Sequence, residues 1–164
     1  PLAWEVWKFY PREFEIGKQA LRLIAKDLEV QLADDEAASV ALHFVNAQKD
    51  VGLHEKDQQM TQIVVGISDI VRLHFGSDLG EDSFSYNRFI THLQYLAQRI
   101  VSGVSGGKND AFLYEQVKLN YPESFVCTKK IATYIETSYS FDLSLDEQVY
   151  LTIHIQRLKD SLNK

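Results

Sequence analysis

Two stretches of this chain repeat one pattern, and the repetition decides the fold. Residues 10–48 read YPREFEIGKQALRLIAKDLEVQLADDEAASVALHFVNAQ, and residues 121–159 read YPESFVCTKKIATYIETSYSFDLSLDEQVYLTIHIQRLK. They align without a gap at an offset of 111 residues, and nine of the 39 aligned positions are identical. The shared residues include a helix-opening proline, an Asp-Glu pair suited to a first helical turn, and a histidine eight residues after the Asp. Such self-similarity predicts a tandem array of one structural unit.

The remaining segments are interpreted as helices separated by short polar breaks. Apolar residues recur at intervals of three and four over about 56–76 and 83–102, which is the spacing of amphipathic helices. Further helices are predicted at 2–9, 11–28, 34–48, 109–120, 122–139 and 144–163. Ser144 followed by Glu147 forms a capping box at the start of the last one. No segment shows convincing period-two alternation, so the predicted fold class is all-α.

The repeat also predicts the domain organisation. The polar segment 49–55 is the candidate boundary between residues 1–50 and residues 56–164. With a period near 111, residues 56–164 make one complete copy of the unit. Residues 1–50 then make only the second half of an earlier copy, and we expect its first half upstream.

Composition excludes several classes of protein. Hydrophobic residues are 45% and charged residues 24% of the 164, as in an ordinary globular protein. The net charge of −6 argues against nucleic-acid binding by these residues, because phosphate contacts need clustered positive charge. The single cysteine, Cys127, forms no intrachain disulfide and indicates a reducing, cytoplasmic compartment. No apolar run approaches the roughly 20 residues of a membrane helix.

His92 has neighbours that suit an anion. On a helix it shares a face with Arg88 and Arg99, and also with Ser85 and Tyr95. The planar fork of arginine matches phosphate oxygens, so this face favours a phosphate-holding role. From local sequence alone, however, the plainer interpretation is a surface histidine on a solvated face.

His43 and His154 stand at the same place in the two copies. His154 shares its helix face with Arg157, and also with Glu147, Tyr150 and Ser161; His43 shares its face with Glu36, Ser39, Asn46 and Asp50. The recurrence makes a functional role as good an interpretation as a shared structural role, such as a buried hydrogen bond. Of the other histidines, His74 continues an apolar stripe and is expected to be partly buried, and His54 is expected to be solvated.

The patterns of common active sites fail here. His54-Glu55 is followed by Gln58 where a zinc-binding helix needs a second histidine. Gly107-Lys108 lacks the first glycine and the following Ser or Thr of a phosphate loop. Cys127 falls on a packed helix without a polarising neighbourhood. We therefore predict no catalytic residue, no metal and no cofactor, and we do not expect an enzyme.

Four strings carry a resemblance to a known family. They are EFEIGK at 13–18, DEAASVALHFVNA at 35–47, YNRFITHL at 86–93 and YLTIHI at 150–155. In this order and spacing, the chain resembles the PTS regulation domains (PRDs) of the BglG/LicT/SacY family of transcriptional antiterminators. The resemblance spans essentially the whole chain. It implies a small N-terminal RNA-binding domain outside this sequence, followed by two helical PRDs with two phosphorylatable histidines each.

The resemblance also implies residue roles. His43 would be the second histidine of the first PRD, and His92 and His154 the two histidines of the second. They would accept phosphoryl groups from HPr or a sugar-specific enzyme II of the phosphotransferase system, and the module would act as a homodimer. In such families, modification of the second PRD by HPr tends to activate, and modification of the first by enzyme II tends to inhibit.

The charges near the histidines suggest that the two copies respond differently. A phosphoryl group facing Arg88, Arg99 or Arg157 could bridge two subunits, whereas one on His43 would be repelled by nearby acids. Two alternatives stay open: the PRD of a DNA-binding transcriptional activator, and a helical interaction domain with structural histidines.

Overall fold

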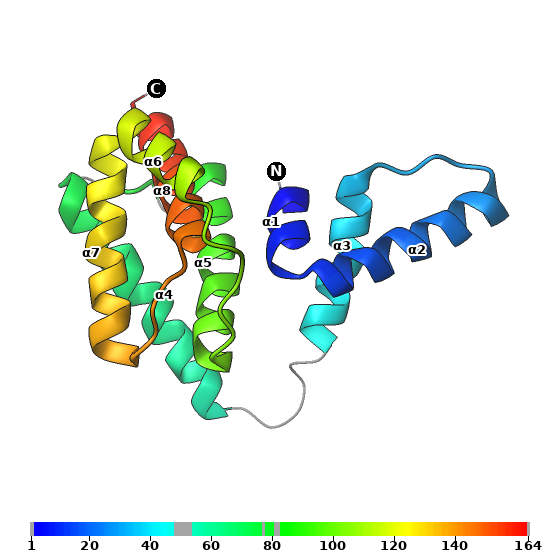
Figure 1. Ribbon diagram of the computed structural model, residues 1–164, viewed down its shortest axis with the longest axis horizontal. Helices are drawn as coiled ribbons and strands as arrows, with labels where there is room; N and C mark the ends of the chain where they lie inside the picture. The colour runs from blue at the N-terminus through cyan, green and yellow to red at the C-terminus, as the bar shows by residue number, and fades with distance from the viewer. Residues whose placement is uncertain (1, 48–53, 77, 81–82, 164) are drawn as a thin grey trace. The chain divides into compact units, whose positions relative to one another are not determined.

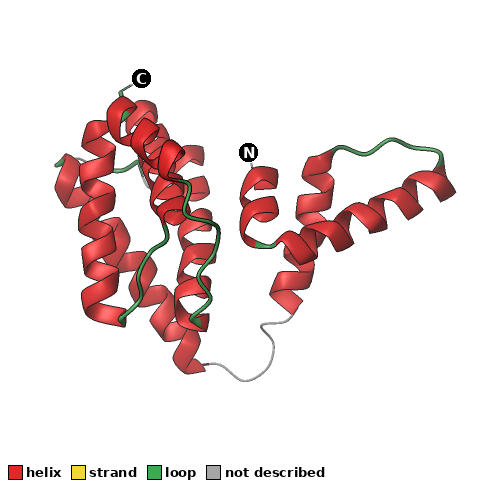
Figure 2. Cartoon of the chain, in the orientation of Figure 1, coloured by secondary structure: helices red, strands yellow, loops and turns green. Residues whose placement is uncertain are grey.

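The computed structural model describes residues 2–47, 54–76, 78–80 and 83–163. The predicted all-α class is confirmed: these residues form helices and connecting loops, and no strand occurs among them (Figure 2). The chain divides into two compact units, Pro1–Leu53 and His54–Lys164. No helix in the described part of the chain has the length and apolar character needed to cross a bilayer.

The described residues of the first unit, 2–47, form three helices, α1 (Leu2–Phe9), α2 (Pro11–Leu28) and α3 (Asp34–Ala47). Helices α2 and α3 pack closely because small residues lie where they cross. A Cβ atom added to Gly17 of α2 would lie 2.3 Å from the backbone oxygen of Ala37 in α3. Ala37, Ala38 and Ala41 are fully buried along the same helix.

Replacing Gly17 with alanine is therefore expected to destabilise the first unit. In an ordinary helix this change stabilises by about 0.5–1 kcal/mol. Here the new Cβ atom would clash with the Ala37 backbone, so the same change should instead lower the free energy of unfolding by about 1–3 kcal/mol. Urea unfolding followed by circular dichroism measures the effect, with Gln19→Ala on the exposed side of α2 as the matched control. A stabilised Gly17→Ala variant would contradict the close approach.

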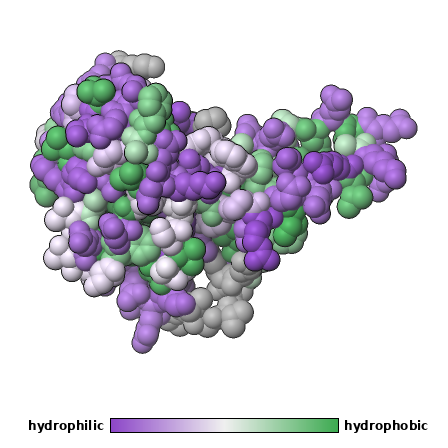
Figure 3. All heavy atoms as spheres, viewed as in Figure 1, coloured by the Kyte–Doolittle hydropathy of each residue, from purple (hydrophilic) through white to green (hydrophobic). Residues whose placement is uncertain are grey.

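The second unit, in the part that the structure describes, is a bundle of five helices (Figure 1). They are α4 (His54–Phe75), α5 (Phe84–Ser102), α6 (Ala111–Asn120), α7 (Pro122–Tyr139) and α8 (Leu145–Leu162). The apolar faces of α4, α5, α7 and α8 supply the core, whose buried residues include Ile63, Ile67, Leu93, Leu96, Ile131, Ile135, Ile155 and Leu158. Polar and apolar side chains are mixed on the visible faces of both units (Figure 3).

The sequence repeat is also a structural repeat. Helices α7 and α8 begin 111 residues after α2 and α3. The residue before each pair adopts nearly the same backbone angles, φ −131° at Tyr10 and −130° at Tyr121. Both first helices end at a non-glycine residue in the left-handed region, Glu29 at φ 53° and Ser140 at φ 51°. The two copies therefore share their turns as well as their helices.

The copies differ in what covers their apolar faces. In the second unit Ile135 and Leu143 are buried in the core that α4 and α5 complete. The equivalent residues of the first unit, Ile24 and Leu32, are 40% and 41% exposed. Residues 2–47 contain no counterpart of α4 and α5. The described helices of the first unit therefore match α6, α7 and α8 in order, whereas the expectation that they are half of a longer copy stays a prediction.

Two details differ from the sequence expectations. Helix α4 begins at His54, so the predicted connection 49–55 ends earlier than expected; residues 48–53 and the His54 side chain lie outside the described residues. Ser144 caps α8 by accepting a hydrogen bond from the Glu147 N–H at 3.1 Å. The Glu147 carboxylate, assigned to the capping box, accepts hydrogen bonds from Arg99 of α5.

Candidate functional site

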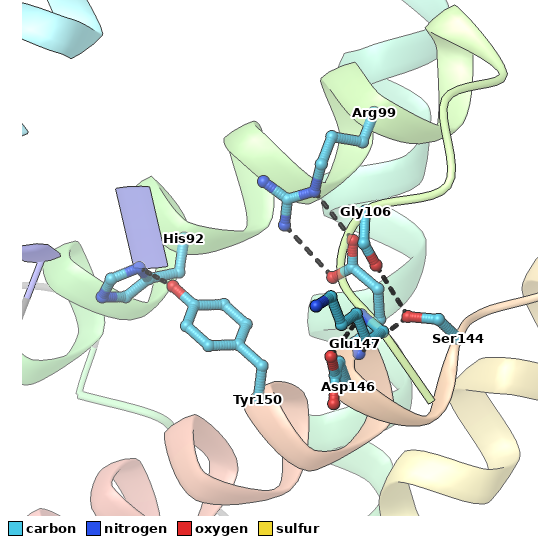
Figure 4. A network of polar contacts seen from close by, with 8 residues as sticks. His92, Arg99, Gly106, Ser144, Asp146, Glu147 and Tyr150 are labelled. Carbon is cyan, nitrogen blue, oxygen red and sulfur yellow. Dashed lines mark hydrogen bonds and ion pairs between the residues drawn. The ribbon is translucent and has the colours of Figure 1, made fainter. Parts of the chain in front are cut away.

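The polar faces predicted for α5 and α8 meet each other in the second unit. We define the α5–α8 seam as His92 and Arg99 of α5 with Glu147, Tyr150 and His154 of α8. Figure 4 shows His92 directed at Tyr150 and Arg99 directed at Glu147. The interpretation of His92 as a surface histidine is wrong, because the residue is only 3% exposed. The interpretation failed because the polar face of α5 that carries His92 packs against a polar face of α8 instead of facing solvent.

The two histidines of the seam lie against each other. The ring centroids of His92 and His154 are 3.8 Å apart, and the ring planes are inclined by 33°. The hydroxyl of Tyr150 shares a hydrogen bond with Nδ1 of His92. The Tyr150 ring also meets the His154 ring edge-on, with centroids 4.2 Å apart. Tyr150, to which the sequence analysis gave no role, thus contacts both histidines; its i, i+4 spacing from His154 was the available signal.

His154 is held in its neutral form. Burial, together with the neighbouring His92, Arg157 and Arg88, lowers the pKa of His154 to about 2. A neutral imidazole has one protonated ring nitrogen and one with a lone pair. That lone pair makes the ring a nucleophile at neutral pH.

A pocket of about 190 Å³ opens beside His154. The first turns of α5 and the C-terminal half of α8 form its wall, which consists of Phe84, Ser85, Arg88, Phe89, His154, Arg157 and Leu158. Two of these residues are cationic and none is acidic. The pocket therefore has the charge to attract an anion to one side of His154.

Arg99 lies elsewhere in the seam. Its guanidinium donates two hydrogen bonds to the Glu147 carboxylate, Nε to Oε1 at 2.8 Å and the second nitrogen to Oε2 at 3.2 Å. The two side chains are 3% and 0% exposed. The neighbouring Asp146 accepts hydrogen bonds from the backbone N–H groups of Lys108 and Asp110 (Figure 4 shows this end of the seam). These hydrogen bonds connect α5 and the loop after it to the start of α8. Arg99 is therefore engaged with Glu147, and it is not part of the pocket wall.

The other candidate residues lie apart from the seam. His43 is exposed on α3 of the first unit, as are Glu36 and Asn46 on its helix. His74 is half-buried, and its Nδ1 lies 3.0 Å from Nζ of Lys130. Cys127 is fully buried, and burial raises the pKa of its thiol to about 12. No group of three or more His, Cys, Asp or Glu side chains placed to hold a metal occurs among the described residues.

Comparison with known proteins finds one family and several relatives. The model of the PRD domain family matches residues 1–47 and 66–158. The chain is 42% identical to the transcription antiterminator LicT of Bacillus subtilis (strain 168) over 160 residues, which cover 96% of this chain and 56% of that protein. It is 38% identical to the beta-glucoside operon antiterminator of Dickeya chrysanthemi over 163 residues, 99% of this chain and 57% of that one. The chain spans somewhat more than half the length of these relatives.

Proposed function

Because the chain belongs to the family of PRD domains of BglG/LicT/SacY-type transcriptional antiterminators, we propose a regulatory function for it. In this proposal the chain is the phosphorylation-controlled regulatory and dimerisation module of such an antiterminator. The named relatives are antiterminators. This favours the antiterminator over the alternative of a DNA-binding activator. In this proposal the module is cytoplasmic and is not an enzyme, and it reaches RNA only through a domain outside this sequence.

One observation carries the proposal. Two histidines from different helices lie face to face, and one of them borders a pocket with two arginines. We assign His92 and His154 as phosphoacceptors of the complete copy. His43, which aligns with His154, is the acceptor in the other copy. A purely structural histidine pair would not need two arginines beside it.

The chemistry is a transfer between imidazole rings. A neutral ring nitrogen of the acceptor histidine attacks the phosphorus of a phosphohistidine on HPr, or of the phosphorylated enzyme II. A new N–P bond forms, the donor's bond to phosphorus breaks, and its electron pair returns to the donor atom. The acceptor gains a charge of about −1.5 to −2 and three oxygen acceptors. Because the rings of His92 and His154 are packed together, modification must change how α5 and α8 meet, and this change would set the dimeric state.

Phosphotransfer in vitro tests the proposal. The chain is incubated with phosphoenolpyruvate, enzyme I and HPr, and the phosphate is mapped by mass spectrometry at neutral pH. We expect label on His92 or His154 and none in the His92→Ala/His154→Ala variant, whereas His74→Ala, outside the seam, should label normally. A folded chain that takes no label from HPr or from enzyme II would show that the histidines are structural.

A further inference from the structure

The pocket beside His154 has an unusual charge arrangement for this protein. The second unit contains four arginines, Arg72, Arg88, Arg99 and Arg157. Arg72 pairs with Asp69 and Arg99 pairs with Glu147. Arg88 and Arg157, the two in the pocket wall, make no ion pair within the described part of the chain. Their charges are therefore available to a ligand.

His154 adds a buried polar group to the same pocket. The residue is 7% exposed, and its ring makes no hydrogen bond to another described residue. The ring lies in the pocket wall, where a ligand can reach it. In its neutral form the ring offers one N–H donor. The pocket thus combines the guanidinium groups of Arg88 and Arg157 with one neutral N–H donor, that of the His154 ring.

The N-terminus of α5 also favours an anion in this pocket. Phe84 and Ser85 lie in its first turn, where backbone N–H groups have no partner within the helix. The side chain of Ser83 accepts a hydrogen bond from the N–H of Tyr86. The N–H groups of Phe84 and Ser85 lie before it, at the positive end of the helix dipole beside the two arginines.

The volume fits a small oxyanion. At roughly 30 Å³ for each water in the liquid, the pocket of about 190 Å³ has room for one phosphorus with four oxygens and some retained water. The corresponding place in the first unit lacks one of the cations, because Asn46 aligns with Arg157. The pair of arginines beside the histidine is therefore a feature of the second unit.

We propose that this pocket binds a phosphate dianion non-covalently in the unmodified protein, with Arg88 and Arg157 holding its oxygens beside His154. No bond is made or broken in this binding. The biological meaning of the site rests on the proposed function, because the same two arginines would then receive the phosphoryl group carried by His154. Free phosphate and that phosphoryl group would compete for one place.

Titration with inorganic phosphate tests the site without any phosphoryl donor. Isothermal titration of the unmodified chain at low salt should give a Kd on the order of 1 mM, and the ring signals of His154 in NMR spectra should shift. Arg88→Gln and Arg157→Gln should each weaken binding about tenfold. Arg72→Gln, which removes an arginine outside the pocket, should leave it unchanged, and Arg157→Lys should lose less than Arg157→Gln because the charge remains.

The outcomes separate this site from the phosphorelay. Equal binding by wild type and by a folded Arg88→Gln/Arg157→Gln variant, or a shift of phosphate binding by Arg72→Gln alone, would overturn the site. If phosphotransfer fails while phosphate still binds through Arg88 and Arg157, the proposed function falls and the site stands. Chain that has been phosphorylated on His154 should no longer bind free phosphate.

Discussion

Replacing Arg99 with methionine is expected to lower the free energy of unfolding of the second unit by about 3–5 kcal/mol. The substitution keeps a long apolar stem but removes both hydrogen bonds that the guanidinium donates to Glu147. The Glu147 carboxylate, which is 0% exposed, would then stay buried without this counter-charge. Urea unfolding of the variant and of the wild type, followed by circular dichroism, measures the difference.

The chain offers a matched control. Arg72 also pairs with a carboxylate, that of Asp69 at 2.6 Å, but the two side chains are 54% and 49% exposed. Solvent and salt screen such a pair, so Arg72→Met should cost less than about 1 kcal/mol. Adding Glu147→Leu to Arg99→Met should restore part of the lost stability, because no buried charge is left behind. Equal costs for the Arg99 and Arg72 variants would show that burial of the first pair does not matter.

Most of the fold could be predicted from the sequence because its signals are local or repeated. Proline at the start of a helix and apolar spacing located the helices. The offset of 111 residues predicted a repeated unit, and the turns at Tyr10 and Tyr121 do match. Both kinds of signal depend on short-range backbone preferences, which packing leaves unchanged here. The start of α4 was missed because nothing in residues 49–55 distinguishes a polar connection from a polar first turn.

The seam was only half predictable for a physical reason. Helical periodicity places His92 and Arg99 on one face of α5, but it does not tell which neighbouring helix that face meets. The partner is decided by packing between segments about 50 residues apart, and 48 residues separate Arg99 from Glu147. Glu147 also fits a capping box, so its sequence context suggested a local role. The burial of His92 and the contact of Tyr150 with both histidines follow from the same long-range packing.

The stability of the second unit is expected to fall between pH 6.5 and 4.5, with His154 as a major cause. Burial, together with the facing groups His92, Arg157 and Arg88, lowers the pKa of His154 in the folded protein to about 2. Below pH 6.5 the unfolded chain takes up a proton at this residue and the folded chain does not. The stability contribution is thus complete well above pH 6.5, and its loss approaches about 1.4 kcal/mol for each pH unit below that value. Between pH 6.5 and 4.5 the loss from this residue is about 2.3 kcal/mol.

The His154→Gln variant isolates that contribution. Its unfolding free energy should depend less steeply on pH than that of the wild type, and urea unfolding at pH 6.5, 5.5 and 4.5 measures the difference between the two curves. His74→Gln should flatten the curve less, although burial and Lys130 also lower the pKa of His74. Parallel curves for wild type and His154→Gln would contradict the expectation. Because the same lowered pKa keeps the ring neutral, His154 should still accept a phosphoryl group at pH 5.5, where an ordinary histidine is mostly protonated and no longer nucleophilic.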